Sequence, residues 1–248
     1  MMLPAWLSAA VLAAAMSATF ALGWRVGRRS PHMAKAPLQL DRATLATLGL
    51  LLAFTFSLAL AEHNKRAERA IEDANAIGSF YTCAGFLDEP LRGQLQSVVR
   101  RYLLERVRLA RTHDTMDTLA HELPVFSRMH TEMRELVREA VAAKSPVTVP
   151  LANGLNALQS SHADRLAAIH HRLPWSILTL LAVAAIVCML IVGIERGAVG
   201  EHSSVPIASF VLLVSLVVWV TLDLNQPGSG VITVSQEPLE RLLATMAR

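Results

Sequence analysis

The stretch LLAFTFSLALAEHNKRAERAIEDANAIGSFYTCAGF, residues 51–86, decides how this chain folds. No charged residue occurs in it before Glu62, and from there charged residues recur every few positions. Neither Pro nor Gly interrupts it before Gly78. Because no helix breaker separates the apolar part from the charged part, the stretch predicts one long helix that leaves a membrane and continues into water.

Three further segments are as apolar as the start of this stretch. Together with the second span, the segments without Asp, Glu, Lys or Arg are Leu3–Trp24, Ala43–Ala61, Leu173–Ile194 and Val205–Leu222. Of the 248 residues, 53% are hydrophobic and only 17% are charged, which is too apolar for an ordinary soluble domain. About 20 helical residues cross the hydrocarbon core of a bilayer. The sequence therefore predicts four membrane-spanning helices.

The first of these segments is expected to be retained rather than removed as a secretory signal. A signal peptide carries basic residues before its apolar run, whereas here the basic cluster WRVGRRS, residues 24–30, follows the run. Small residues recur every four positions in this segment, at Ala9, Ala13, Ser17 and Ala21. Such a stripe lets another helix approach closely, so it predicts the face of the first span that packs on a neighbour.

The segment between the second and third spans predicts a bundle of amphipathic helices. Arg69 and Asp73 are expected to pair across one turn on the solvent side of the extended second helix. Further helices are expected over Leu91–Arg111 and about Pro124–Ala143, and a returning helix leads into the third span. Short turns between amphipathic helices favour antiparallel packing. The apolar faces are predicted at Ala67, Ala70, Ile71, Ala74, Ile77, Tyr81 and Ala84; at Leu95, Val98, Val99 and Tyr102; at Phe126, Met129, Met133, Leu136, Val137 and Ala140; and at Leu155, Leu158, His162, Leu166 and Ile169.

The chain is therefore expected to be all-α: a four-span transmembrane helical protein in which two long helices extend into a soluble helical bundle. A short extended segment is expected near the C-terminus. The predicted parts are residues 1–61, the first transmembrane hairpin; 62–172, the soluble bundle continuous with spans 2 and 3; 173–222, the second transmembrane hairpin; and 223–248, an extended segment and a short helix.

The C-terminal part is read from TLDLNQPGSGVITVSQEPL, residues 221–239. Asp223 is expected to end the fourth span at the membrane surface, and Pro227 with the glycines up to Gly230 to stop the helix. The alternation in VITVS, residues 231–235, predicts a half-buried extended segment on the soluble helices, with Ile232 and Val234 covered. A short helix over Glu237–Arg248 is expected to follow.

Two stretches of the chain resemble the bacterial bestrophin-like family of membrane proteins. The first is residues 51–103, with its helix break at a proline followed by a helix rich in Arg and Tyr. The second is Leu222-Asp223-Leu224-Asn225-Gln226-Pro227 followed by Gly230, which is close to the family pattern L-D-L-D-R-P with a later glycine. Asn225 and Gln226 depart from that pattern, so any role of the family's two charges is lost here or is performed by neutral amides.

The resemblance implies a homo-oligomeric channel for anions in the inner membrane of a bacterium. Two sets of residues are candidates for lining a pore. Phe54 and Phe56 are candidates for an apolar constriction, or for aromatic packing in the membrane. Glu72, Asn75, Ser79 and Thr82 fall on one polar stripe that would line a vestibule around an oligomer axis, or would serve buried polar groups within the bundle. The motif residues Asp223, Asn225, Pro227 and Gly230 form the third candidate set.

Several function classes are disfavoured. None of the four spans carries an ionisable residue in its apolar core, which argues against an ion-coupled transporter. The nine histidines are not spaced as a set of zinc ligands, so no metal and no cofactor is expected. No nucleophile, base and acid can be grouped, so the chain is not expected to be an enzyme. A diffuse net charge of +3 suggests no nucleic-acid partner.

Charge also predicts an orientation. The short first loop, residues 25–42, carries five basic residues and one acid, which favours the cytoplasmic side. The N-terminus and the soluble bundle are then expected outside, although Lys65, Arg66 and Arg69 after the second span point the other way. The expected partners are the lipid bilayer, further copies of the chain and anions. The alternative function is a non-conducting membrane sensor or scaffold whose soluble bundle binds a ligand or a protein.

Overall fold

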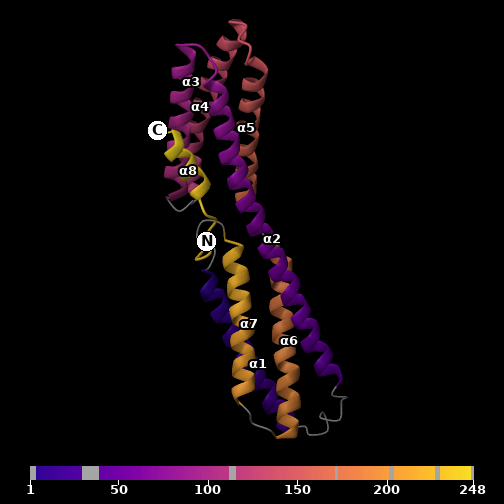
Figure 1. Ribbon diagram of the computed structural model, residues 1–248. Helices are drawn as coiled ribbons and strands as arrows, with labels where there is room; N and C mark the ends of the chain where they lie inside the picture. Colours follow the sequence, from indigo (N-terminus) through magenta and orange to yellow (C-terminus); the bar gives the residue numbers. More distant parts are fainter. Residues whose placement is uncertain are drawn as a thin grey trace. The chain divides into compact units, whose positions relative to one another are not determined.

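The computed structural model describes residues 4–29, 39–111, 116–170, 173–200, 204–226 and 230–246. Over these residues the chain forms eight α-helices and no β-strand, so the all-α prediction is confirmed (Figure 1). The helices are α1 (Ala5–Arg29), α2 (Gln39–Ala84), α3 (Leu91–Arg111), α4 (Met116–Ala142), α5 (Thr148–His170), α6 (Trp175–Val199), α7 (Ser204–Leu224) and α8 (Glu237–Met246).

Four of these helices are long and apolar enough to cross a membrane. The spanning segments are Ala5–Arg29, Ala43–Ala84, Trp175–Val199 and Val205–Leu224. They contain the four uncharged runs, except for the first residues of the first and third runs. The prediction of a four-span helical membrane protein is therefore confirmed.

The two long helices expected from the sequence differ in their continuity. Helix α2 has 46 residues and runs without a break from the second span into the charged part of the chain. The returning path is divided instead: α5 ends at His170 and α6 begins at Trp175. Pro174 precedes α6 with φ −56° and ψ 135°, which is not a helical conformation. Proline cannot donate a backbone hydrogen bond and pushes the residue before it out of the helical region, so it separates the two helices.

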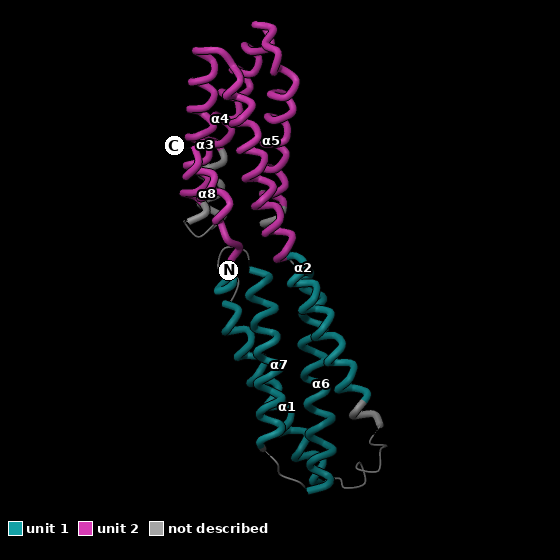
Figure 2. Tube along the Cα trace, viewed as in Figure 1, with its two compact units in different colours: residues 1–62, 172–226, 230–232 teal, residues 63–171, 227–229, 233–248 magenta. Residues whose placement is uncertain are grey.

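The chain divides into two compact units, coloured separately in Figure 2. Unit 1 comprises residues 1–62, 172–226 and 230–232, and unit 2 comprises residues 63–171, 227–229 and 233–248. Helix α2 contributes its first part to unit 1 and its remainder to unit 2.

Unit 2 is built from the second part of α2 with α3, α4, α5 and α8 around one apolar core. The predicted apolar faces supply much of this core, and their largest fully buried side chains are Ile77, Leu95, Tyr102, Phe126, Met133 and Leu158. Phe80, Leu103 and Leu151 are equally buried and were not predicted. The side chains of the predicted Leu166 and Ile169 lie outside the described part of the structure. Ile71 is an exception, since it was predicted to face the core and is about half exposed. Besides the predicted Ala70 and Ala74, the buried side of α2 carries Asp73 at this point.

Unit 1 contains α1, the first part of α2, α6 and α7, and its tightest contact joins α1 to α6. Gly23 and Gly27 of α1 face Gly193 and Gly197 of α6. A Cβ atom added at Gly27 would lie 2.0 Å from the carbonyl oxygen of Ile194. Only glycine permits this approach of two helix backbones.

This contact corrects the predicted packing stripe of α1. Of the four small residues expected on it, Ala9 is buried, whereas Ser17 and Ala21 are exposed. The buried positions of α1 are Ala5, Ala9, Leu12, Met16, Gly23 and Gly27. The contact continues into the basic end of α1, beyond the uncharged run from which the stripe was read.

Candidate functional site

The polar stripe predicted on α2 lies on the exposed surface of unit 2. Glu72, Asn75 and Ser79 are all exposed, and the buried face of the same helix turns carries Asp73 and Ile77. These three polar side chains therefore do not serve buried groups of the bundle in the single chain. The fourth residue of the predicted stripe, Thr82, is also exposed, and the stripe extends at the same spacing to the exposed Glu68.

The two aromatic candidates on the first part of α2 point in different directions. Phe54 is 61% exposed, whereas Phe56 is half-buried and packs on Ala59, Leu173 and Leu224 within unit 1. Because each residue turns a helix by about 100°, residues two apart lie on opposite sides. The structure therefore does not bring the two phenylalanines together.

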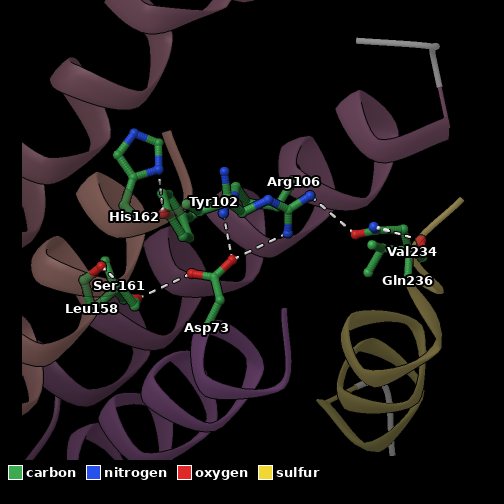
Figure 3. A network of polar contacts seen from close by, with 9 residues as sticks. Asp73, Tyr102, Arg106, Leu158, Ser161, His162, Val234 and Gln236 are labelled. Atoms are coloured by element: carbon green, nitrogen blue, oxygen red, sulfur yellow. Dashed lines mark hydrogen bonds and ion pairs between the residues drawn. The ribbon is translucent and has the colours of Figure 1, made fainter. Parts of the chain in front are cut away.

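A buried ionic cluster lies inside unit 2, and Figure 3 shows it at close range. Its centre is Asp73 of α2, which is fully buried. The carboxylate of Asp73 accepts hydrogen bonds from Arg106 of α3, from the hydroxyl of Ser161 at 3.1 Å and from Arg165 of α5 at 3.4 Å. The expected pairing of Asp73 with Arg69 in solvent is wrong: Arg69 donates to the backbone carbonyl of Asp164 at 3.5 Å.

Arg165 joins this cluster to the segment that precedes α8. Its second nitrogen donates to the side-chain oxygen of Gln236 at 3.0 Å, and the amide nitrogen of Gln236 donates to the carbonyl of Val234 at 3.1 Å. An unpaired buried charge would cost several kcal/mol, so these contacts hold three helices and the C-terminal segment of unit 2 in one arrangement.

Aromatic and imidazole rings pack beside the ionic cluster. The hydroxyl of Tyr102 lies 3.3 Å from Nδ1 of His162, and the rings of His162 and His130 stand edge to face with centroids 5.1 Å apart. Burial, together with the nearby charge of Arg106, lowers the pKa of His162 to about 4. Burial likewise lowers the pKa of His130 and raises that of Tyr102. Both imidazoles are therefore neutral at pH 7.

These histidines do not form a metal centre in the part of the chain that the structure describes. Among those residues no group of three His, Cys, Asp or Glu side chains is placed to hold an ion. The cluster ties α2, α3 and α5 together, because Asp73 of α2 accepts hydrogen bonds from side chains of both other helices.

The C-terminal motif forms a second polar site, in unit 1. Asp223 is buried near the end of α7, and its two carboxylate oxygens accept from the backbone N–H groups of Val231 at 3.0 Å and Ile232 at 2.8 Å. Gly230 fits against Asp223 so closely that a Cβ there would lie 2.9 Å from the Asp223 carboxylate. Pro227 of the predicted motif lies outside the described residues.

This arrangement corrects the expected packing of residues 231–235. Val231 is 77% exposed, and Ile232, which was predicted to be covered, is 38% exposed. The segment is non-helical and forms no strand. Two backbone hydrogen bonds to Asp223, rather than burial of its side chains, hold its beginning in place.

Asn225 of the same motif binds the segment that precedes α6 in unit 1. Its side-chain oxygen accepts from the backbone N–H of Leu173 at 2.7 Å, immediately before Pro174 and α6. The neutral amide therefore has a structural role that connects the end of α7 to the beginning of α6.

Sequence reasoning missed the ionic cluster although its spacing carried a signal. Asp73 lies three residues after Ala70 and four before Ile77, on the buried face of α2. Arg106 lies four residues after Tyr102 on the buried face of α3. A carboxylate and a guanidinium on apolar helix faces are expected to find each other, because neither is stable alone in a core.

Comparison with known proteins identifies the family. Neither the curated proteins nor the solved structures yield a match to this chain. The model of the Bestrophin-like domain matches residues 13–239, which includes all four spanning segments in whole or in large part and both stretches that carry the resemblance. The chain is therefore a multi-pass membrane protein that belongs to the bestrophin-like family.

Proposed function

We propose that the protein is a homo-oligomeric channel that lets anions cross the inner membrane of a bacterium. The observation that carries this proposal is the exposed stripe on α2. In unit 1 the helix leaves Phe54, Ser57 and Ala61 exposed, and in unit 2 it leaves Glu72 and Asn75 exposed at matching spacing. A helix with one uncovered face of this kind suits the lining of a path shared by several subunits.

The chain belongs to the bestrophin-like family. This supports the channel assignment, because the family name implies kinship with anion channels. The candidate lining of the path is neutral in the membrane part, at Phe54 and Ser57, and polar in unit 2, at Asn75 and Ser79. An amide such as that of Asn75 donates a hydrogen bond to an anion without carrying charge. Glu72 opposes anion passage, which makes its charge the most informative one to remove.

The test is anion flux into liposomes that contain the purified protein. Glu72→Gln removes one negative charge per subunit from the path. An anion about 6 Å from that charge in water is repelled by about 0.7 kcal/mol, so the flux is expected to rise roughly threefold. Glu135→Gln is the matched control, because Glu135 is exposed on α4 rather than on the α2 stripe. Equal effects of the two substitutions on anion flux would show that the α2 stripe does not line the path.

Absence of any ion flux from folded, reconstituted protein would contradict the channel proposal. It would leave the alternative, a non-conducting sensor or scaffold whose soluble bundle binds a ligand or a partner. The size of the detergent-solubilised particle tests the oligomer separately, because a path lined by one helix of each chain requires several copies. A monomeric particle that conducts would overturn the shared path.

The proposed orientation places the N-terminus and unit 2 on the outer side and the basic first loop in the cytoplasm. This proposal rests on the positive charge of residues 25–42. Lys35, which lies outside the described residues, provides the test: a cysteine placed there should react with an impermeant reagent only after the cells are opened. Labelling in intact cells would reverse the orientation.

A further inference from the structure

Unit 1 contains a cavity of about 670 Å³ between α1, α6 and α7. This volume is in the range of sites that hold small apolar molecules. The cavity is lined by Ser8, Leu12, Leu173, Pro174, Trp175, Leu178, Thr179, Leu181, Ala182, Val218, Leu222, Asn225 and Gln226. None of these side chains carries a charge, so the cavity suits a ligand that is mainly apolar.

The polarity of the lining changes along the spanning helices. Asn225, Gln226 and the first residue of α6, Trp175, lie at the helix ends. Leu181 and Ala182 lie about 10 Å further along α6, at 1.5 Å per residue. The cavity is thus polar where the spans end and apolar toward their middle. A phospholipid in a bilayer has the same order, with oxygen atoms at the surface and acyl chain within.

Asn225 supplies a defined hydrogen-bond donor at the polar end. The residue is only 9% exposed, and its oxygen is used by the backbone N–H of Leu173. The amide group must then present its nitrogen elsewhere, and this nitrogen makes no hydrogen bond within the described part of the chain. A donor on a side chain that is nine-tenths buried, in the wall of a cavity, is placed to serve a bound acceptor.

The beginning of α6 adds backbone donors beside Asn225. Its N-cap residue is Pro174, which has no side chain able to accept from the first turn. In the described structure the N–H groups of Trp175 and Ser176 have no acceptor, as is usual for first-turn N–H groups without a cap. The helix dipole also favours electron-rich oxygen atoms at this end. Donors from two elements therefore meet at one end of an apolar cavity.

We propose that this cavity is a binding site for one phospholipid of the surrounding bilayer. An acyl chain occupies the apolar part, between Leu12, Leu181, Ala182 and Val218. An ester or phosphate oxygen of the same lipid accepts hydrogen bonds from the amide nitrogen of Asn225 and from the N-terminus of α6. The site is independent of whether the protein conducts ions.

The test measures phospholipid that remains bound after extensive washing in a neutral detergent, by native mass spectrometry of the full chain. Ala182→Trp fills the apolar part of the cavity and is expected to reduce the retained phospholipid at least fivefold. Leu212→Trp is the matched control, since Leu212 is exposed on α7 but does not line the cavity. Retention that is equal in the two variants overturns the proposal.

A second variant tests the hydrogen-bond donor of Asn225 separately from its structural hydrogen bond to Leu173. Asn225→Asp keeps an oxygen for the N–H of Leu173 but replaces the amide donor by a negative oxygen. It is expected to lower phospholipid retention severalfold in the protein that remains folded, whereas unchanged retention overturns the assigned headgroup contact. Inorganic phosphate provides the last comparison: if phosphate alone displaces the bound lipid, the apolar cavity does not contribute to binding.

A second copy of the chain is the rival occupant of the cavity. If Ala182→Trp dissociates the oligomer while the amount of bound phospholipid per chain stays constant, the cavity is a subunit contact and the lipid proposal is overturned. Loss of lipid from an oligomer of unchanged size supports the lipid site.

Discussion

Arg106 donates a hydrogen bond to the fully buried carboxylate of Asp73, 33 positions away in the sequence and on a different helix. The neighbouring residue Glu72 belongs to the exposed stripe of the same helix. Two adjacent acidic residues thus have opposite environments. In unit 2 the buried Asp73 holds helices together, and the exposed Glu72 is available to ions or to partners.

Asp73→Asn is expected to destabilise the protein strongly, because it removes the negative charge that faces Arg106 and Arg165. Loss of one partner of a buried ion pair costs about 3–5 kcal/mol. The melting temperature of the detergent-solubilised protein should fall clearly for this variant. For Glu72→Gln the change in unfolding free energy should stay within about 0.5 kcal/mol. Similar melting of the two variants would mean that the Asp73 cluster contributes little to stability.

The buried histidine beside this cluster predicts a loss of stability in acid. Unfolded His162 takes up a proton near pH 6.5, whereas the folded residue does so only near its lowered pKa of about 4. Between these values the unfolded chain binds more protons, so the stability present at neutral pH falls as the pH drops from about 6.5 to about 4. The groups around His162 are Tyr102, Phe126, His130, Arg106, Asp73 and Arg165.

His162→Gln is expected to make this part of the stability curve shallower, because glutamine takes up no proton. The measurement is thermal melting at several pH values between 4 and 7, with the difference between the two proteins as the readout. Carboxylates elsewhere titrate equally in both and cancel. Parallel curves would show that His162 is not the group responsible.

The glycine contact between α1 and α6 predicts that a single methyl group destabilises unit 1. A Cβ at Gly197 would lie 2.2 Å from the carbonyl oxygen of Trp24, so Gly197→Ala must push the helices apart. Such overpacking costs about 1–3 kcal/mol. Gly49→Ala is the control, because nothing lies within 4 Å of its added Cβ. It should melt at the same or a slightly higher temperature, since alanine favours a helix.

The contacts of the C-terminal motif predict that the Asp223 carboxylate contributes more to stability than the apolar side chains of the segment whose backbone it binds. Asp223→Ala leaves the N–H groups of Val231 and Ile232 without their acceptors. Since a hydrogen bond to a charged group is worth about 1.5–3 kcal/mol, the variant should melt earlier and expose residues 230–236 to proteases. Val231→Ser should have little effect, because Val231 is largely exposed. A larger loss of stability for Val231→Ser than for Asp223→Ala would mean that burial of side chains holds the segment.

Local patterns in the sequence determined the helices and most of the apolar core. Four uncharged runs predicted the four spans because chain length and bilayer thickness leave little choice. The period of the apolar residues predicted the buried faces of α3 and α4, down to Tyr102 and Met133. Both depend on neighbours along the chain, so a sequence contains what is needed to find them.

Tertiary contacts decided the polar positions, because their environment depends on residues distant in sequence. Asp73 is fully buried only because Arg106, Ser161 and Arg165 come from other helices to compensate its charge. The glycines of α1 matter only because α6 presents glycines opposite them. Likewise Ile232 is held by Asp223 through its backbone, a contact that the alternation of its side chains cannot reveal. The apolar pattern of one segment thus predicts which face is buried, whereas the compensation of a buried charge requires partners that only the folded chain brings together.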